Sequence, residues 1–248
     1  MNSPCLLVKN LCKNFGGLQA VNDLHLSLEP GERRAIIGPN GAGKTTLFNL
    51  ISGTLPPSSG KIHLFGKDVT RFSPHRRAAL GLARTFQITN LFPNLSLFEN
   101  VLLAVQALDK VKYSMLRPVS SYRRLESRTY ELLEEWGLRE KAGELARNLS
   151  YGDQRQVELI LALAGKPRLL LLDEPTSGLS PAETSTVTEA IRRLDSDITI
   201  VLIEHDMDVA FGLADRVSVL HFGSLLAEGS VNEIKDDPRV TEIYLGGE

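Results

Sequence analysis

Residues 38–45 read Gly-Pro-Asn-Gly-Ala-Gly-Lys-Thr, which fits the pattern G-x-x-x-x-G-K-[ST]. In such a loop the glycines let backbone N–H groups point at phosphates, and the start of the following helix adds positive potential. Lys44 would reach the terminal phosphates, and the Thr45 hydroxyl can hold Mg²⁺. An apolar stretch at 34–37 and a helix-like stretch at 44–52 flank the loop, which argues against a flexible turn with an incidental lysine. The predicted nucleotide-binding residues here are Gly38, Pro39, Asn40, Gly41, Ala42, Gly43, Lys44, Thr45 and Thr46.

Two acidic residues, Asp173 and Glu174, follow the apolar run 169–172. Ligands of α/β sheets bind at the carboxyl ends of the strands, which is where these side chains would lie. Asp173 would bind Mg²⁺, usually through the water molecules that this ion retains. Glu174 could then orient the attacking water or accept a proton from it. A capping acid before Pro175 is the alternative for this pair alone, and the upstream phosphate loop makes nucleotide hydrolysis the stronger prediction.

The elements that must position these motifs follow from hydrophobic periodicity. Short apolar or alternating segments predict strands, and longer segments with one apolar side predict helices. The predicted strands are 6–9, 24–28, 34–37, 169–172, 198–203 and 217–220, and the predicted helices are 44–52, 122–136, 151–165, 181–194 and 207–214. Because the later strands alternate with helices, the pattern predicts an α/β fold with parallel strands and crossover connections.

Composition narrows the class of protein. With 248 residues, 42% apolar and 23% charged, the chain has ordinary globular composition. A formal net charge of -2 offers no general field for attracting nucleic acid, although a local basic patch is compatible with it. The chain has neither a run of apolar residues long enough to span a bilayer nor a signal-like start, so we expect it to stay inside the cell. We expect Cys5 and Cys12 to be reduced thiols.

The stretch Leu149-Ser150-Tyr151-Gly152-Asp153-Gln154 lies just upstream of the second acidic motif. Ser150 can cap a helix and Gly152 leaves backbone N–H groups bare, so this helix start could bind an anion, with a plain cap as the alternative. In this position the stretch resembles the signature motif of ABC ATPases, commonest as Leu-Ser-Gly-Gly-Gln. It departs from that motif at Tyr151, which adds bulk, and at Asp153, which adds a negative charge near the expected phosphate.

The resemblance implies roles for three further residues. Gln87 corresponds to the glutamine that contacts the metal or the attacking water and senses the membrane subunits. His205 resembles the switch histidine that contacts the γ-phosphate, and Phe15 stands where the family stacks an aromatic ring on adenine. Each residue alone has an ordinary structural alternative: a surface glutamine, a histidine whose ring is hydrogen-bonded within the fold, and a phenylalanine of the core. The order and spacing of the three residues favour the functional interpretation. Residues 177–180 stand where the family has a loop that contacts the second subunit of a dimer. That loop often ends in Asp, and Ser180 in its place weakens any role for this position in the nucleotide site of the other subunit.

Finer features resemble the ATPases of branched-chain amino-acid importers, and urea and short-chain amide importers share nearly all of them. They are residues 81–87, 91–93, 203–207, 228–229, 237–240 and 244–246. The resemblance spans essentially the whole chain and implies one domain, 1–248. It would comprise a P-loop NTPase core with a parallel sheet and an amino-terminal antiparallel β part, in 1–89 and 167–248, and a helical subdomain at about 90–166.

The same resemblance implies cofactors and partners. The cofactors would be ATP and Mg²⁺, and the partners a second ABC ATPase subunit, identical or different, and two transmembrane permease subunits. In the family two such domains pair head to tail, so each ATP lies between one phosphate loop and the partner's signature helix. A periplasmic-type solute-binding protein would act indirectly, the chain would lie peripherally on the cytoplasmic face of the inner membrane, and no nucleic-acid partner is expected. The solute stays open.

Two other classes of protein also contain phosphate loops of this kind. A soluble ABC ATPase that acts on ribosomes or DNA would carry two such domains or long coiled coils, and this sequence indicates one domain and no coiled coil. A P-loop kinase or small GTPase would leave the signature helix and His205 without a role.

The segment 88–95 is rich in apolar residues, yet Asn and Pro interrupt it as in a loop. We interpret it as a groove wall for a permease helix, with Phe92 as an anchor; the alternative is that Leu91 and Phe92 tie the helical insertion to the core.

Overall fold

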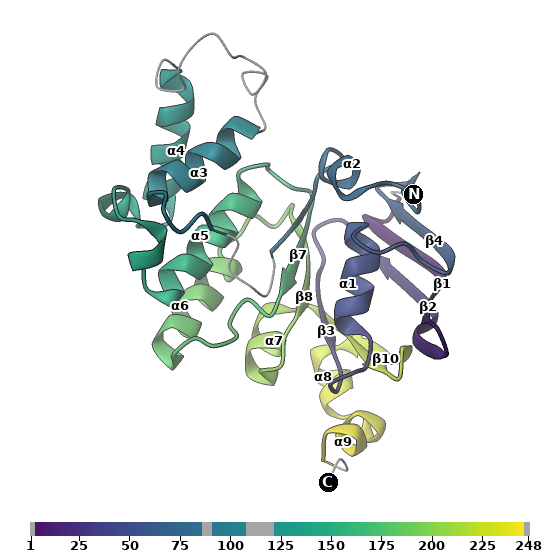
Figure 1. The fold of residues 1–248 in the computed structure, drawn as a ribbon. Coiled ribbons are helices and arrows are strands. Elements are labelled where there is room, and N and C mark those ends of the chain that lie inside the picture. Colours follow the sequence, from purple (N-terminus) through teal and green to yellow (C-terminus); the bar gives the residue numbers. More distant parts are fainter. Residues whose placement is uncertain (1–2, 86–90, 108–121, 246–248) are drawn as a thin grey trace.

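The computed structural model describes residues 3–85, 91–107 and 122–245 (Figure 1). Its strands are β1 (Leu6–Phe15), β2 (Leu18–Leu28), β3 (Arg33–Ile37), β4 (Ser59–Leu64), β5 (Lys67–Asp68), β6 (Leu82–Arg84), β7 (Leu169–Asp173), β8 (Thr199–Ile203), β9 (Arg216–His221) and β10 (Ser224–Ser230). Its α-helices are α1 (Lys44–Ser52), α2 (Pro74–Ala78), α3 (Leu97–Ala107), α4 (Arg123–Glu135), α5 (Tyr151–Leu163), α6 (Pro181–Arg192), α7 (Met207–Leu213), α8 (Val231–Lys235) and α9 (Pro238–Leu245). None of the helices in these ranges is both long and apolar enough to cross a membrane.

The central sheet has six strands in the order β10-β9-β3-β8-β7-β6. All neighbours in it are parallel except β10 and β9, which form an antiparallel hairpin. Strands β7 and β8 are buried along their whole length because both faces of the sheet are covered, and this explains their continuous apolar sequences. Alternate residues of one strand enter different cores: Leu169 and Leu171 pack toward α1, and Leu170 and Leu172 pack toward α6 and α7. The predicted α/β class is confirmed.

The amino-terminal part is a separate antiparallel sheet in the order β2-β1-β4-β5. Its inner face packs against α1 and the central sheet, where Leu6, Leu24 and Phe48 belong to one buried cluster. The antiparallel part was expected from the family resemblance and is present. Strands β4 and β5 were not predicted individually.

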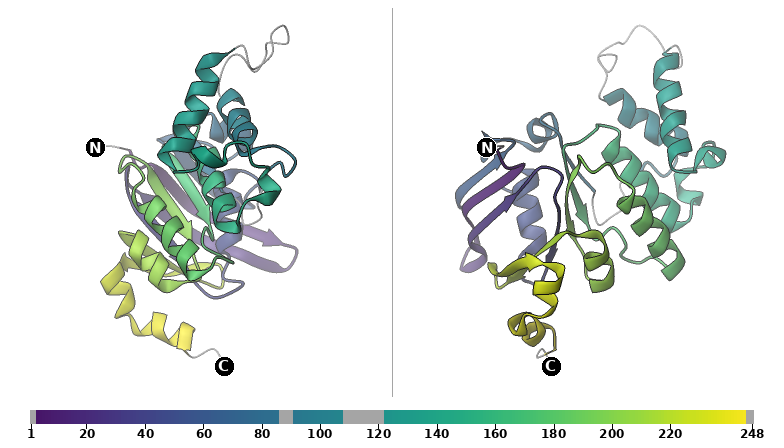
Figure 2. Two further views of the ribbon diagram at one scale, coloured as in Figure 1. Left: turned by 90° about the vertical axis from the view of Figure 1, so that its left-hand side faces the viewer. Right: turned by 180° about the vertical axis from the view of Figure 1, so that it is seen from behind.

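A third buried cluster holds together the helices at the other side of the molecule from this sheet (Figures 1 and 2). It joins α3, α4 and α5 through residues such as Val101, Leu133 and Ile160. Two 3-10 helices, η3 (Arg139–Lys141) and η4 (Ala146–Asn148), lie in the connection between α4 and α5. The predicted helices 122–136 and 151–165 correspond to α4 and α5, each within two residues at both ends. A helical subdomain at about 90–166 remains our proposed division of the chain. Cys5 and Cys12 are free thiols, as expected.

Candidate active site

The phosphate loop connects the end of β3 to the start of α1, as the sequence predicts. Gly38 and Gly43 have φ of 148° and 100°, and a Cβ atom would lie 2.2 Å from the Leu220 carbonyl oxygen or 2.4 Å from the Ala20 carbonyl oxygen, respectively. Only glycine fits at both positions, because any side chain would collide with backbone. The residue before α1, Gly43, has no side chain that could cap the start of this helix. This cradle fits phosphate.

Lys44 lies inside this loop and is buried. Its Nζ donates hydrogen bonds to the carbonyl oxygens of Gly38, at 2.6 Å, and Pro39, at 3.0 Å. Burial lowers the pKa of Lys44, and the nearby carboxylates of Glu174 and Asp173 act in the opposite direction. The fold therefore brings the predicted lysine and both predicted acids into one electrostatic neighbourhood.

Asp173, the last residue of β7, is buried and paired with an arginine. Its Oδ2 lies 2.8 Å from Nη2 of Arg84, and the same guanidinium donates to Asn49 Oδ1 at 2.7 Å. This pairing was not predicted, although Arg84 lies in a stretch that resembles the family. Thr45, in the first turn of α1, is exposed. Carboxylate and hydroxyl oxygens at this loop have the chemistry that Mg²⁺ requires.

Glu174 and His205 face each other across the ends of two adjacent parallel strands. Asp173 is in register with Ile203, and the N–H of Glu174 donates to the Ile203 carbonyl at 2.9 Å. Glu174 adopts a left-handed backbone with φ of 49°, and its Oε1 lies 2.6 Å from Nε2 of His205. A non-glycine residue in this conformation is held by its surroundings, which is common where a side chain has to be aimed.

Glu204, the residue before His205, holds the backbone around this pair in place. Its carboxylate is buried and accepts hydrogen bonds from the N–H and the hydroxyl of Thr176, at 3.0 and 2.8 Å, and from the N–H of His205 at 3.2 Å. Burial raises the pKa of Glu204, which these hydrogen bonds partly offset. Glu204 thus joins the turn after Glu174 to the end of β8. Nothing in the sequence pattern distinguished it from an ordinary strand-end residue.

Ser150 and Gly152 begin α5, as predicted. The Ser150 hydroxyl caps this helix by accepting from the N–H of Asp153 at 3.1 Å. The two departures from the family motif have structural partners. Asp153 is neutralised by Lys141, with Nζ and Oδ2 at 2.6 Å, and the Tyr151 ring packs against Gly178. The negative charge expected at Asp153 is therefore balanced within the chain.

The remaining predicted residues differ in how far the structure places them. Phe15, at the end of β1, is 47% exposed, and Nζ of Lys13 lies over its ring at 5.1 Å from the centroid. Gln87 and positions 88–90 lie outside the described residues. Leu91 packs against the buried cluster of the helical part, as the packing alternative expects, whereas the Phe92 side chain is 58% exposed and belongs to no buried cluster of the described residues. Tyr244 of α9 was not among the predicted site residues, yet it contacts the phosphate loop. Partial burial raises the pKa of Tyr244, and a hydrogen bond with the Gly38 backbone acts in the opposite direction.

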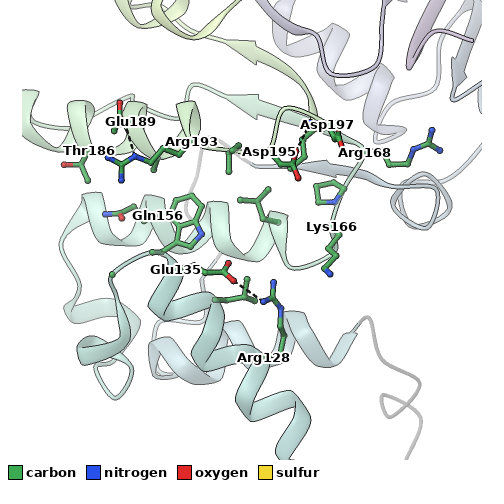
Figure 3. Close-up of a pocket in the computed structure, with 18 of the residues that line it drawn as sticks. Arg128, Glu135, Gln156, Lys166, Arg168, Thr186, Glu189, Arg193, Asp195 and Asp197 are labelled. Atoms are coloured by element: carbon green, nitrogen blue, oxygen red, sulfur yellow. Dashed lines mark hydrogen bonds and ion pairs between the residues drawn. The ribbon is translucent and has the colours of Figure 1, made fainter. Parts of the chain in front are cut away.

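A cleft of about 1090 Å³ lies between α4, α5 and α6 (Figure 3). Its walls carry two ion pairs, Arg128–Glu135 and Arg193–Glu189. None of the predicted site residues lines this cleft, so it is separate from the phosphate loop.

Comparisons with known proteins agree with this geometry. The family model described as ABC transporter matches residues 21–177, and the model described as branched-chain amino acid ATP-binding cassette transporter matches residues 224–248. The high-affinity branched-chain amino acid transport ATP-binding protein LivG of Escherichia coli strain K12 is 41% identical over 253 residues, covering 99% of each chain.

Solved structures are similar over nearly the whole chain as well. The ADP conformation of MJ1267, an ATP-binding cassette of an ABC transporter, has a TM-score of 0.85 at 29% identity and covers 99% of each chain. A dimeric post-hydrolysis state of the ATP-binding cassette MJ0796 bound to ADP and Pi has a TM-score of 0.77 at 26% identity, covering 91% of this chain and 98% of that one.

Proposed function

The chain belongs to the ABC transporter family, and on that premise we propose that it is the ATP-hydrolysing subunit of an importer for branched-chain amino acids. The observation that carries the hydrolytic part is the 2.6 Å contact between Nε2 of His205 and Oε1 of Glu174, next to Asp173. The carboxylates of Glu174 and Asp173 also act to raise the pKa of Lys44 in the phosphate loop. The match over 224–248 and the full-length similarity to LivG support the solute class and favour it over urea or short-chain amides.

In this proposal each predicted site residue has a part in the reaction. Backbone N–H groups of the phosphate loop and of the start of α1 hold the phosphates, and Lys44 exchanges its carbonyl partners for phosphate oxygens. Thr45 and Asp173 are the residues that would hold Mg²⁺, which supplies positive charge to the phosphates when bound. Glu174 would orient the attacking water and accept its proton. Nε2 of His205, which lies 2.6 Å from Oε1 of Glu174 in the free subunit, would exchange this partner for the γ-phosphate.

Each ATP site is shared between two chains in this proposal. Ser150 and Gly152 start a helix whose N–H groups can bind an anion, yet they belong to α5 and not to the phosphate loop. The dimeric state of MJ0796 supports pairing of two chains. The head-to-tail arrangement, in which α5 would serve the partner's ATP, is what the family resemblance implies. Opening and closing of this dimer would be the two-state element linked to transport.

Coupling to the membrane would pass through the segment around Phe92. An exposed aromatic side chain just before α3 is suited to act as a buried anchor in a complex. We place a short cytoplasmic helix of a permease against it, with Gln87 transmitting its movement toward the site. The chain would then sit peripherally on the cytoplasmic face of the membrane, and a periplasmic-type binding protein would deliver the solute to the permeases.

Uptake by the complete transporter tests this proposal. The chain, its permeases, its second ATPase subunit and its binding protein, identified from neighbouring genes, are reconstituted in proteoliposomes with ATP on the cytoplasmic side. We expect ATP-dependent uptake of labelled leucine that unlabelled isoleucine or valine competes away and that urea leaves unchanged. Uptake of urea or acetamide in place of leucine would overturn the solute class, and uptake without ATP would overturn the role of the subunit.

A further inference from the structure

Glu183, in the first turn of α6, joins the starts of two helices through one carboxylate. Its Oε2 accepts from the N–H of Ser180 at 3.0 Å and from the Ser180 hydroxyl at 2.7 Å. Its Oε1 accepts from the N–H of Gly152, in the first turn of α5, at 3.0 Å. The contact is close, because a Cβ atom on Gly152 would lie 2.8 Å from Cγ of Glu183. This carboxylate therefore occupies an N–H group that the proposed function directs at the partner's ATP.

Capping of α6 does not require the bond to Gly152, as a comparison with two other helix starts shows. Glu99 caps α3 and Glu233 caps α8 with the same geometry: in each, one oxygen accepts from the N–H and the hydroxyl of a serine three residues earlier, at 2.7 and 2.9 Å for Glu99 and at 2.7 and 2.8 Å for Glu233. One carboxylate oxygen is therefore enough for this motif. Among these three glutamates of the described chain, Glu183 alone extends its second oxygen to another helix.

The carboxylate of Glu183 is charged under ordinary conditions. Its hydrogen bonds with the Ser180 side chain and backbone lower its pKa, and the N–H of Gly152 lowers it further. A terminal phosphate brought to the same N–H would compete with Glu183 for the donor and would meet a like charge at contact distance. Asp153, the acid in the first turn of α5 itself, is already balanced by Lys141. Glu183 is therefore the acid that would repel a phosphate at the start of α5.

We propose that Glu183 is a placeholder for phosphate: it binds the Gly152 N–H in the free subunit and must give way when ATP held by the partner reaches the start of α5. The inference rests on the proposed shared site. It assigns Glu183 a quantitative role, since displacement of the carboxylate costs free energy and raises the ATP concentration at which two subunits close. It also gives Ser180 a role, because the serine retains the displaced side chain at the helix start through Oε2.

ATP-driven dimerisation in a Glu174→Gln background tests the placeholder, since turnover is then suppressed. The fraction of dimer is measured by analytical ultracentrifugation at a series of ATP concentrations, for the chain alone or with the second ATPase subunit of its transporter. The test variant is Glu183→Gln, which preserves length and one carbonyl oxygen but removes the charge. The matched control is Glu233→Gln, which makes the same change in a capping box without a second helix.

We expect Glu183→Gln to lower the midpoint ATP concentration roughly three- to tenfold, the range for loss of one hydrogen bond of ordinary net strength, and Glu233→Gln to leave it unchanged. Glu183→Ala should lower it too. A midpoint that stays the same or rises in both Glu183 variants would overturn the placeholder and make Glu183 a support for α5. A Glu174→Gln parent that binds ATP and never dimerises would overturn the shared site itself, and the placeholder with it.

Discussion

Nε2 of His205 lies 2.6 Å from Oε1 of Glu174, although 31 positions separate the two residues in the chain. The distance is a consequence of sheet register, because β7 and β8 are parallel neighbours that end at the same level. Glu174 directly follows the end of β7, and His205 follows the end of β8 by two positions. The pair therefore forms without a loop having to fold back, and the arrangement directs both side chains to the edge of the sheet where the phosphate loop begins.

The first prediction concerns His205. His205→Ala should lower ATP turnover by the complete transporter about 10²-fold, as loss of one donor to a developing charge does elsewhere. ATP binding by the free subunit should change little, because Lys44 and the loop backbone hold the phosphates. The matched control is His25→Ala, another exposed histidine hydrogen-bonded to a side chain, Asn10, on the amino-terminal sheet. Equal turnover in the two variants would remove His205 from the reaction.

The second prediction concerns the buried carboxylate of Glu204 and its donor Thr176. Thr176→Val removes the hydroxyl at 2.8 Å and should destabilise the folded chain by about 1–3 kcal/mol at neutral pH. The control is Thr188→Val, because the Thr188 hydroxyl is buried and has no hydrogen-bond partner among the described residues. Thermal unfolding of both variants measures the difference, and a loss as large in Thr188→Val would contradict the assignment.

The pH dependence of this effect has a definite sign. Burial raises the pKa of Glu204 in the folded state, so between the ordinary carboxyl value and that raised value the folded chain binds more protons than the unfolded chain. The contribution of Glu204 to stability is therefore fully present below the ordinary value and is lost as pH rises through the raised one. Since the hydroxyl of Thr176 stabilises the charged form, the deficit of Thr176→Val should grow as pH rises through this window. A deficit that shrinks with rising pH would contradict it.

Local motifs allowed most of the candidate site to be predicted. The phosphate loop and the acids at 173 and 174 depend on strand, turn and helix signals that are contiguous in the sequence. The helices 44–52 and 207–214 were similarly evident from composition and periodicity, and their ends agree with α1 and α7 to within one residue. Hydrophobic periodicity did not predict some short elements, among them β5 with two residues and α2 with five, because so few residues show no period.

Contacts between distant segments could not be predicted. Arg84 meets Asp173 only because β6 lies beside β7, and no local pattern in either segment indicates that neighbour. Lys141 and Asp153 come from different elements of the helical part, so the charge at Asp153 had to be considered unbalanced until the fold was known. These pairings depend on tertiary packing, which a single sequence does not encode in its spacing.

The third prediction uses that ion pair. If Lys141 neutralises Asp153 beside the partner's phosphate, Lys141→Met should raise the ATP concentration needed for dimerisation of the Glu174→Gln variant about two- to fivefold, and Lys141→Arg should restore it. Arg139→Met is the control, since Arg139 lies in the same 3-10 helix and pairs with Glu134 instead. Dimerisation curves that coincide for Lys141→Met and Arg139→Met would exclude this electrostatic role.

The fourth prediction concerns coupling to the permeases. Phe92→Ser should lower solute uptake and permease association at least about tenfold, as expected for an aromatic anchor, with little change in thermal stability or ATPase activity of the free subunit. Tyr130→Ser is the control, because Tyr130 is a partly exposed aromatic residue of the helical part that stacks on Phe98. A Phe92→Ser protein that assembles and transports normally, or that unfolds when purified, would defeat the docking hypothesis.

Phosphate release by the complete transporter carrying Glu174→Gln tests the central claim most directly. Binding of ATP is measured on the same preparations, with Lys44→Ala as the comparison that should weaken binding itself. Because Glu174 handles the attacking water and Lys44 holds the phosphates, we predict that Glu174→Gln binds ATP like the wild type and releases phosphate about 10²- to 10⁴-fold more slowly. Phosphate release at a near-normal rate by Glu174→Gln would contradict the account.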